Sequence, residues 1–405
     1  MDRELPGWRD ELQCDPYPHY ERERRTAGLT YVAELDAWLV ARDAEVREVL
    51  RRTEDFSSAN ALVPDILPGP AALAVLGGGF GGRPVVVTSD GARHQELRGP
   101  LVRGLSPARV AAVLPYAAQR VAELVGSFVD AGEAELMGAY AQRLPGDVIG
   151  RIVGLDPADV PAVVHGGHRA EELLFRPLEE SEQIAAAEDV VDMQRILERY
   201  VRERHASPRE DLCSELVASV VEPGGEITLD QRHELVAHLQ NLLIAGHLTT
   251  TALIGTTVLH LLRHPEQWAL LCAEPERIPA AVEEAARYDS ALQGFRRVTT
   301  RPVSLAGTEL PAGAAVFVAF GGANRDPDRH ERADTFDISR TPARHLAFGF
   351  GAHGFPGAQL AREQLRLTME ELTRRLPRLR LAEGEAVEMR PTMIHRSPLR
   401  LHLAW

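Results

Sequence analysis

The amino-acid sequence predicts a mainly helical fold with a few small β-sheets. Apolar residues recur at helical spacing through most of the chain from residue 107 onward. One of these stretches, residues 228–264, is apolar around most of its circumference, which is typical of a helix that runs through the centre of a protein. Short runs with strand character occur near residues 29–40, 297–319 and 399–403.

The elements follow in order from these patterns. Two β-like runs, at residues 29–33 and 37–40, predict a small hairpin sheet. Residues 63–85 contain several prolines and a glycine-rich run, and predict a mobile loop. The helical stretches are residues 107–131, 138–153, 157–165, 180–205, 228–264, 269–273, 278–288 and 357–376. Strand-like runs at residues 297–303, 316–319 and 399–403 complete the prediction.

The composition is that of a soluble globular protein. Of 405 residues, 44% are hydrophobic and 26% are charged, so the chain can bury a large core. The formal net charge of −14 argues against nucleic-acid and anionic-membrane partners, since both need a basic footprint. The start of the chain lacks a signal-peptide pattern, and no apolar run approaches the ~18 residues of a membrane span. We expect a cytoplasmic protein.

The three cysteines do not form a recognisable site. Cys14, Cys213 and Cys272 are far apart and in no spacing typical of zinc ligands or of a disulfide framework. We interpret them as ordinary thiols and predict no metal site.

The most informative segment is residues 345–362. Its residues Phe348, Gly349, Gly351, His353 and Gly357 fit the pattern F-G-x-G-x-H-x-C-x-G. This segment resembles the proximal haem loop of the cytochrome P450 family, in which the cysteine ligates the haem iron. Phe355 occupies that cysteine position. A thiolate donates electron density to iron and favours O–O cleavage, whereas a phenyl ring has no lone pair to donate.

A second segment, residues 245–250, resembles the family's oxygen-activation pattern A-G-x-[D/E]-T-[T/S]. The small residues Ala245 and Gly246 then open a groove for oxygen, and the acid and threonine deliver protons. Thr249 is present, but Leu248 occupies the position of the acid and carries no proton. The resemblance therefore implies that activating groups are missing on both faces of the haem.

Two further sets of residues fit the same family. Glu284 and Arg287 form an E-x-x-R pair on one helix face, and Arg340 belongs to a downstream segment whose arginine locks onto that pair, which is a structural role. Four residues fall where the family holds the haem propionates. They are His94, Arg98, Arg297 and His353. Arginine forks suit carboxylates, so these groups can anchor propionates without an iron ligand.

The resemblance covers the chain from about residue 15 to its end. It implies a cytochrome P450-like fold with a long central helix and a single domain over residues 1–405. Two states of the haem pocket stay open. Burial and propionate pairing favour weak haem binding, whereas the bulk of Phe355 and the missing iron–sulfur bond favour an empty or refilled pocket.

Two hypotheses follow for the function. The first is a non-catalytic auxiliary protein of bacterial natural-product biosynthesis, similar to cysteine-less P450 relatives that bind and activate a glycosyltransferase. The second is a haem-binding P450-type oxidoreductase or monooxygenase of a secondary-metabolite pathway, with natural or engineered changes in iron ligation. It would take electrons from a ferredoxin and hold a small lipophilic ligand. Water or His345 would then replace the thiolate, and Arg340, Arg344, Arg362 and Arg366 are candidate contacts for an acidic redox partner or solvated charges.

Overall fold

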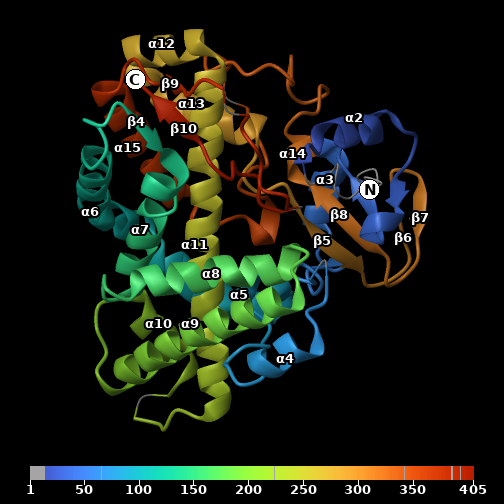
Figure 1. Cartoon of the computed structure of the whole chain (residues 1–405). Helices are drawn as coiled ribbons and strands as arrows, with labels where there is room; N and C mark the ends of the chain where they lie inside the picture. The colour runs from blue at the N-terminus through green and yellow to red at the C-terminus, as the bar shows by residue number, and fades with distance from the viewer. Residues whose placement is uncertain (1–13, 65, 223, 342, 385, 393) are drawn as a thin grey trace. The chain divides into compact units, whose positions relative to one another are not determined.

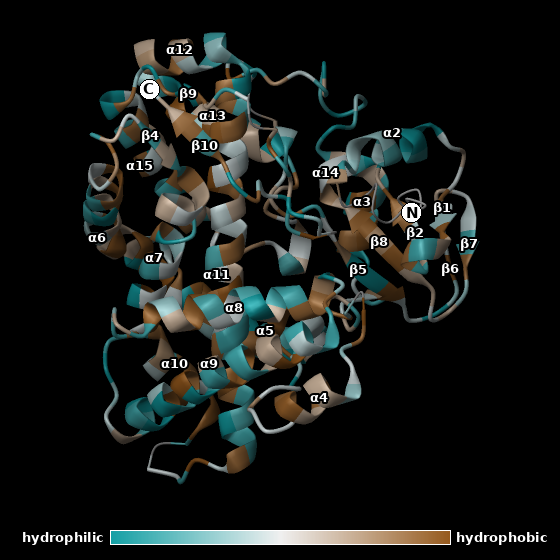
Figure 2. Ribbon diagram, in the orientation of Figure 1, coloured by the Kyte–Doolittle hydropathy of each residue, from teal (hydrophilic) through white to brown (hydrophobic). Residues whose placement is uncertain are grey.

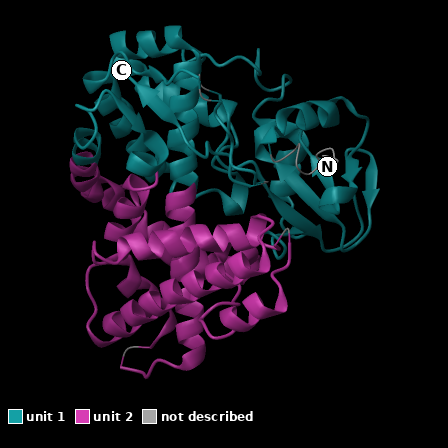
Figure 3. Cartoon of the chain, in the orientation of Figure 1, with its two compact units in different colours: residues 1–61, 121–141, 249–405 teal, residues 62–120, 142–248 magenta. Residues whose placement is uncertain are grey.

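The fold is mainly helical with small sheets, as predicted (Figure 1). The computed structural model describes residues 14–405 except 65, 223, 342, 385 and 393. The chain divides into two compact units, coloured separately in Figure 3. Unit 1 comprises Met1–Ala61, Val121–Ala141 and Thr249–Trp405, and unit 2 comprises Leu62–Arg120 and Gln142–Leu248. A single domain over the whole chain stays a prediction, and each unit is described by itself.

The main sheet of unit 1 has five strands in the order β1-β2-β8-β5-β3. Their bounds are Thr30–Val32 (β1), Ala37–Val40 (β2), Phe56–Ser57 (β3), Gly294–Thr299 (β5) and Ala315–Ala319 (β8). Strands β1 and β2 form the predicted hairpin, and β2 pairs in parallel with β8 at Leu39 and Phe317. Strand β8 is mainly hydrophobic in Figure 2, as expected for a central strand covered on both faces.

Two smaller sheets complete unit 1. Strands β6 (Val303–Leu305) and β7 (Thr308–Leu310) form a hairpin. Its two turn residues, Ala306 and Gly307, both have positive φ, as tight hairpin turns require. The other sheet joins β4 (Glu133–Glu135), β10 (His402–Ala404) and β9 (Arg380–Leu381). Strand β10 is the closing strand that the sequence predicts.

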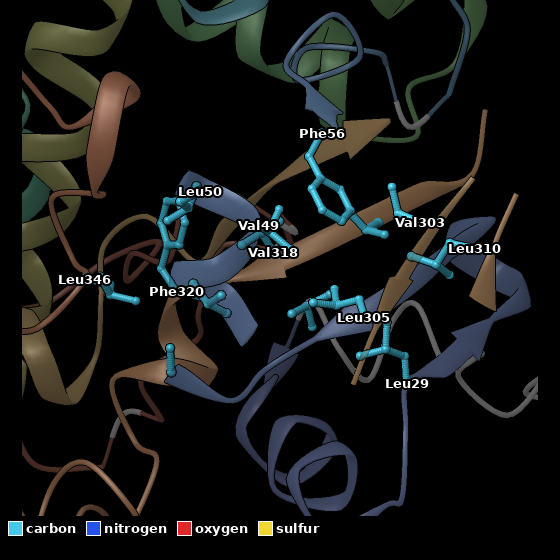
Figure 4. Close-up of a cluster of buried hydrophobic side chains, with 14 residues drawn as sticks. Leu29, Val49, Leu50, Phe56, Val303, Leu305, Leu310, Val318, Phe320 and Leu346 are labelled. Atoms are coloured by element: carbon cyan, nitrogen blue, oxygen red, sulfur yellow. The ribbon is translucent and has the colours of Figure 1, made fainter. Parts of the chain in front are cut away.

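A buried apolar cluster connects the main sheet of unit 1 to the candidate haem loop (Figure 4). It contains Val49 and Leu50 of α3 (Asp43–Arg51), Val318 of β8 and Leu346, the residue after His345. The other helices of unit 1 are α2 (Tyr17–Arg25), α12 (Pro265–Ala273), α13 (Ile278–Tyr288), α14 (Phe320–Ala323) and α15 (Ala358–Arg375). Because Leu346 is fully buried in this cluster, the start of the loop is fixed to the sheet.

Unit 2 is helical. Its helices are α4 (Pro70–Leu76), α5 (Gly91–Gly104), α7 (Leu144–Val153), α8 (Val160–Phe175), α9 (Glu180–Ala206) and α10 (Leu212–Val220), together with most of α6 (Pro107–Gly126). Helices α8 and α9 pack closely at Gly166, where a Cβ would lie 2.5 Å from Cβ of Met193. Glycine therefore sets the spacing of these two helices.

Helix α11 (Leu229–Arg263) is the predicted long central helix. It contributes residues 229–248 to unit 2 and its remainder to unit 1. Among the described residues, it is the one helix long and apolar enough to cross a membrane, but 78% of its most apolar window is buried inside the protein. Such burial is typical of the core helix of a soluble protein.

Some elements differ from the sequence prediction. Residues 70–76, expected in a loop, form α4, because Pro70 starts a run of alanine and leucine with high helix propensity. Helix α5 begins at Gly91 and contains Pro100, both of which hide its helical pattern in the sequence.

Candidate functional site

The candidate haem loop lies in unit 1 and is closed by its own backbone. The backbone N–H of Phe355 donates to the carbonyl of Phe348 at 2.8 Å, and Gly349 donates to Leu346 at 2.8 Å. Gly349 and Gly351 have φ of +71° and +70°, a conformation that other residues rarely adopt. A Cβ on Gly351 would also lie 2.9 Å from the carbonyl oxygen of Leu50. These glycines are needed for the turn itself.

The ring of Phe355 is partly buried and packs against other residues of this loop. It lies parallel to the ring of Phe348, with centroids 6.5 Å apart and an interplanar angle of 3°. Its edge covers Gly357, where a Cβ would lie 3.0 Å from Cζ of Phe355. Both contacts are of the kind that stabilise aromatic side chains. The loop therefore accommodates a phenyl ring at position 355 without opening.

A partly exposed ion pair lies against the ring of Phe348. Arg362 of α15 donates to both carboxylate oxygens of Glu283, at 2.6 and 2.9 Å, while its guanidinium lies 4.2 Å from the ring centroid of Phe348. Burial alone would raise the pKa of Glu283, but hydrogen bonds from His345 and Arg362 lower it to about 2. Glu283 thus stays ionised and fixes Arg362 over the ring.

His345 is engaged in the same network. Its Nε2 lies 3.1 Å from Oε2 of Glu283, and its Nδ1 accepts the backbone N–H of Ala347 at 3.2 Å. Since Nδ1 accepts, Nε2 carries the proton that is donated to the carboxylate. Both nitrogens of His345 therefore have protein partners in this structure, which does not favour the hypothesis that His345 ligates iron.

Two of the four predicted propionate anchors lie in unit 1 and the other two lie in unit 2. In unit 1, Arg297 is 3% exposed and donates to the carbonyl of Arg296 at 2.7 Å, and Nε2 of His353 lies 3.0 Å from Oγ of Ser58. In unit 2, His94 and Arg98 lie four residues apart on α5. Such spacing places their side chains on one helix face. Burial lowers the pKa of the Arg98 guanidinium.

The predicted oxygen-activation segment lies within α11. Leu248 is buried and Thr249 follows it. Ala245 precedes Gly246, where a Cβ would lie 2.6 Å from Cγ1 of Ile149 on α7. Within unit 2, Gly246 therefore permits close packing of two helices.

His247, between Gly246 and Leu248 in the sequence, is a buried residue of this segment that the sequence pattern did not point to. Its Nδ1 lies 2.6 Å from the carbonyl oxygen of Leu243, and its ring meets that of His168 edge to face, with centroids 5.2 Å apart. A Cβ on Gly167 would lie 2.6 Å from Cε1 of His247. The only feature of the sequence related to this contact is the Gly-Gly-His run at residues 166–168. It could not be interpreted from sequence, because the contact forms only when α8 packs against α11.

The structure brings Glu284, Arg287 and Arg340 together. Arg287 donates to the two carboxylate oxygens of Glu284 at 2.7 and 2.8 Å, and Arg340 donates to the same carboxylate at 3.2 Å. Arg287 also donates to the carbonyl oxygens of Asn324 and Ala333. The charges are buried, and each has hydrogen-bond partners, as a stable buried pair requires.

Comparison with known proteins decides the family. Residues 174–400 match the family described as Cytochrome P450. The erythromycin C-12 hydroxylase of Saccharopolyspora erythraea is 32% identical over 385 residues, which cover 93% of this chain and 90% of the relative. The chain belongs to the cytochrome P450 family.

Other similarities agree with this membership. The nocardicin C N-oxygenase of Nocardia uniformis subsp. tsuyamanensis is 34% identical over 378 residues, covering 91% of this chain and 90% of that P450. The solved structure of cytochrome P450 CREJ in complex with (4-ethylphenyl) dihydrogen phosphate has a TM-score of 0.90 and 31% identity, covering 96% of this chain and 97% of CREJ. P450 enzymes bind haem and work with redox partners or carrier proteins.

The residues at position 355 and around it do not fit a thiolate-ligated iron. A phenyl ring offers no donor atom to iron. Cys213 lies on α10 in unit 2, where burial raises the pKa of its thiol to about 12. Cys272 lies on α12, with its sulfur 4.0 Å from the carbonyl oxygen of Pro377.

The arginines proposed to face a redox partner are largely neutralised. Arg362 pairs with Glu283, Arg340 with Glu284, and Arg366 with Glu363 and Glu370. Paired charges of this kind give a weaker electrostatic field than a cluster of unpaired arginines.

Proposed function

We propose that this chain is a P450 homologue without an axial thiolate that acts as a non-catalytic auxiliary protein. Its expected role is to bind and activate a glycosyltransferase in bacterial natural-product biosynthesis. The observation that carries this proposal is the packing of Phe355 against Phe348 and Gly357 inside a closed loop.

This packing argues that the loop is adapted to phenylalanine. A damaged haem loop would leave the ring strained or its neighbours displaced, because overpacking in a filled site costs about 1–3 kcal/mol. Here the ring has an aromatic neighbour, and the backbone hydrogen bond of residue 355 is made. Glu283 binds Arg362, whose guanidinium lies over the ring of Phe348. Leu248, buried in the position of the acid, removes the second group that oxygen chemistry uses.

The names of two relatives support a role in secondary metabolism. The two similar enzymes named above carry the names of an erythromycin hydroxylase and a nocardicin oxygenase. Their oxidative chemistry needs an activated iron, and this chain replaces the group that would activate it. A P450 fold retained without that group supports a binding role, in which the surface of the protein matters more than its iron chemistry.

The test combines spectroscopy with an activity assay. We expect the purified protein to lack a Soret band, to gain none at stoichiometric hemin, and to raise the rate of a glycosyltransferase that co-purifies with it from the producing organism. Phe355→Cys should gain a Soret band and a reduced-CO absorption typical of thiolate ligation, whereas the matched variant Phe355→Leu should not. A monomer that never changes the transferase rate would overturn the auxiliary role.

A second candidate is a haem-binding oxidoreductase with altered iron ligation. The two arginines and two histidines at the four predicted propionate positions favour it, since such donors suit carboxylates, and His94 and Arg297 are buried. This candidate predicts a stoichiometric Soret band in the unaltered protein. It also predicts that His94→Leu and Arg98→Leu lower the affinity for hemin.

A further inference from the structure

Exposed apolar side chains gather on one short segment of unit 2. Among the described residues, the large hydrophobic side chains that are exposed are Tyr31, Val63, Ile66, Leu67, Leu73, Val102 and Leu229. Four of these seven lie within residues 63–73, and Leu67 is 77% exposed and Leu73 52% exposed. Such gathering of apolar side chains on a soluble protein marks an interaction site more often than scattered single residues do.

The segment is fixed to the helices beneath it. At the start of α4, the backbone N–H of Gly69 donates to Oε1 of Gln183 on α9 at 2.7 Å, and Ala72 is buried. Beyond α4, the backbone N–H of Phe80 donates to Gln194 of α9 at 2.8 Å, and the ring of Phe80 lies 5.1 Å from that of His233 on α11. Because both ends are anchored, α4 presents Leu73 outward on a supported surface.

The border of this apolar patch is acidic. Glu179, Glu180 and Glu182 lie exposed at the start of α9, beside Gln183, which binds the start of α4. Residues 62–82 contain no lysine or arginine, and the next cation, Arg83, is paired with Asp230. Figure 2 shows α4 in hydrophobic colours, in contrast to the hydrophilic residues on α9. The patch therefore combines an apolar centre with a negative border.

This combination selects the kind of partner. An anionic membrane or a nucleic acid would be repelled by the three glutamates. A protein surface with an apolar recess bordered by lysine or arginine would bury Leu67 and Leu73 and pair with the acids, as complementary interfaces do. We propose that residues 63, 64 and 66–74, together with the start of α9, dock such a partner protein; we term this surface the α4 patch. This inference rests on the auxiliary role proposed above and identifies the surface through which that role would operate.

The experiment measures binding of the co-purifying glycosyltransferase, the partner implied by the auxiliary role, to the full chain and its variants. We expect Leu67→Asp with Leu73→Asp to weaken the affinity at least ~10-fold, as loss of a central apolar anchor does. The matched control Val102→Asp changes an exposed apolar residue of α5 and should stay within ~2-fold. Thermal unfolding of each variant checks that the fold is retained.

A second variant tests the charged border independently. Glu179→Lys with Glu180→Lys should slow association ~10-fold at low salt and reduce its salt dependence, because complementary charge acts mainly on the association rate. If the unaltered chain binds the transferase and all variants bind equally, the α4 patch is overturned while the auxiliary role stands. If the unaltered chain neither binds nor activates it, both proposals fail. If the unaltered chain binds neutral phosphatidylcholine vesicles and Leu67→Asp with Leu73→Asp abolishes this binding, the α4 patch binds a membrane surface and the proposed protein partner is wrong.

Discussion

The side chain at position 355 determines whether the loop can ligate haem iron, because a cysteine thiolate can donate electrons to iron and the phenyl ring of Phe355 cannot. The sequence alone identified position 355 as the one that ligates iron in the P450 family. That identification rests on the spacing of the surrounding motif residues, Phe348, Gly349, Gly351, His353 and Gly357. The partners of its ring could not be predicted, because Glu283, which fixes Arg362 over Phe348, lies 79 residues earlier in the chain than Arg362. Only folding brings α13 and α15 together, so the support of the stack becomes visible only in the structure.

If the ring of Phe355 stabilises the loop, removing it must lower the stability of the protein. We expect Phe355→Ala to reduce the free energy of unfolding by about 1–3 kcal/mol, since a partly buried ring loses apolar burial and an aromatic contact. Phe355→Leu should lose less. Urea unfolding followed by circular dichroism measures both values in protein without added hemin.

The same unfolding measurement can contradict this prediction. A haem-dependent loop would be disordered in haem-free protein, and Phe355→Ala would then leave the free energy of unfolding unchanged within ~0.5 kcal/mol. In that case hemin would raise the stability of the unaltered protein by mass action.

At the scale of elements, sequence periodicity predicted some helices closely and others poorly. Helix α8 spans Val160–Phe175 where the sequence predicted 157–165, and α6 ends at Gly126 rather than at residue 131. Helix α13 spans Ile278–Tyr288 as expected, and α9 and α11 differ from the predictions by a residue or two at their ends. Helices α4 and α5 were missed because glycine and proline residues in and around them are typical of loops. In the folded protein, packing of their apolar faces against neighbouring helices overrides this low helix propensity. The packing role of Gly246 could not be predicted either, because it depends on the close approach of Ile149 from another helix.

We expect Gly246→Ala to destabilise the protein even though alanine is the better helix former. Alanine in a helix gains about 1 kcal/mol over glycine, but its Cβ would lie 2.6 Å from Cγ1 of Ile149 and force α7 and α11 apart. Overpacking of this kind costs about 1–3 kcal/mol. The measurement is the midpoint and slope of urea unfolding.

Gly126→Ala in α6 is the matched control for this prediction. Its Cβ would have Nη1 of Arg375 as its nearest neighbour, at 3.5 Å, which is an ordinary contact. The control should be neutral or stabilising. A stabilising effect of Gly246→Ala would show that α7 does not press on α11 at this point.

At the scale of the whole molecule, buried charges connect segments that are distant in the sequence of unit 1. Asp289, after α13, accepts hydrogen bonds from Tyr17 of α2 and from Arg396 near the C-terminus, both at 2.7 Å, and from Nε2 of His260 on α11 at 2.8 Å. Burial alone would raise the pKa of Asp289, but Arg396 and His260 hold it well below its usual range. The stability of the unit therefore depends on a charge that acid removes.

We expect the protein to lose stability continuously as the pH falls from about 6.5 to about 3. Burial and the nearby Arg287 lower the pKa of His330 to about 3, and its ring nitrogens have no hydrogen-bond partner among the described residues. Between that value and the ordinary pKa of about 6.5, only the unfolded chain binds the proton, so acid favours unfolding. Glu283 acts in the same direction, because its pKa of about 2 is depressed and its contribution is lost below about pH 4.5.

His330→Leu isolates the histidine part of this dependence. A neutral side chain cannot take up the proton, so the slope of unfolding free energy against pH between 4 and 6 should decrease by up to about 1.4 kcal/mol per pH unit. The control His165→Leu replaces a largely exposed histidine and should leave the slope unchanged. The measurement is urea unfolding at half-unit steps of pH. An equal slope in His330→Leu and the unaltered protein would show that His330 is protonated equally in the folded and unfolded states, which a buried ring beside Arg287 does not allow.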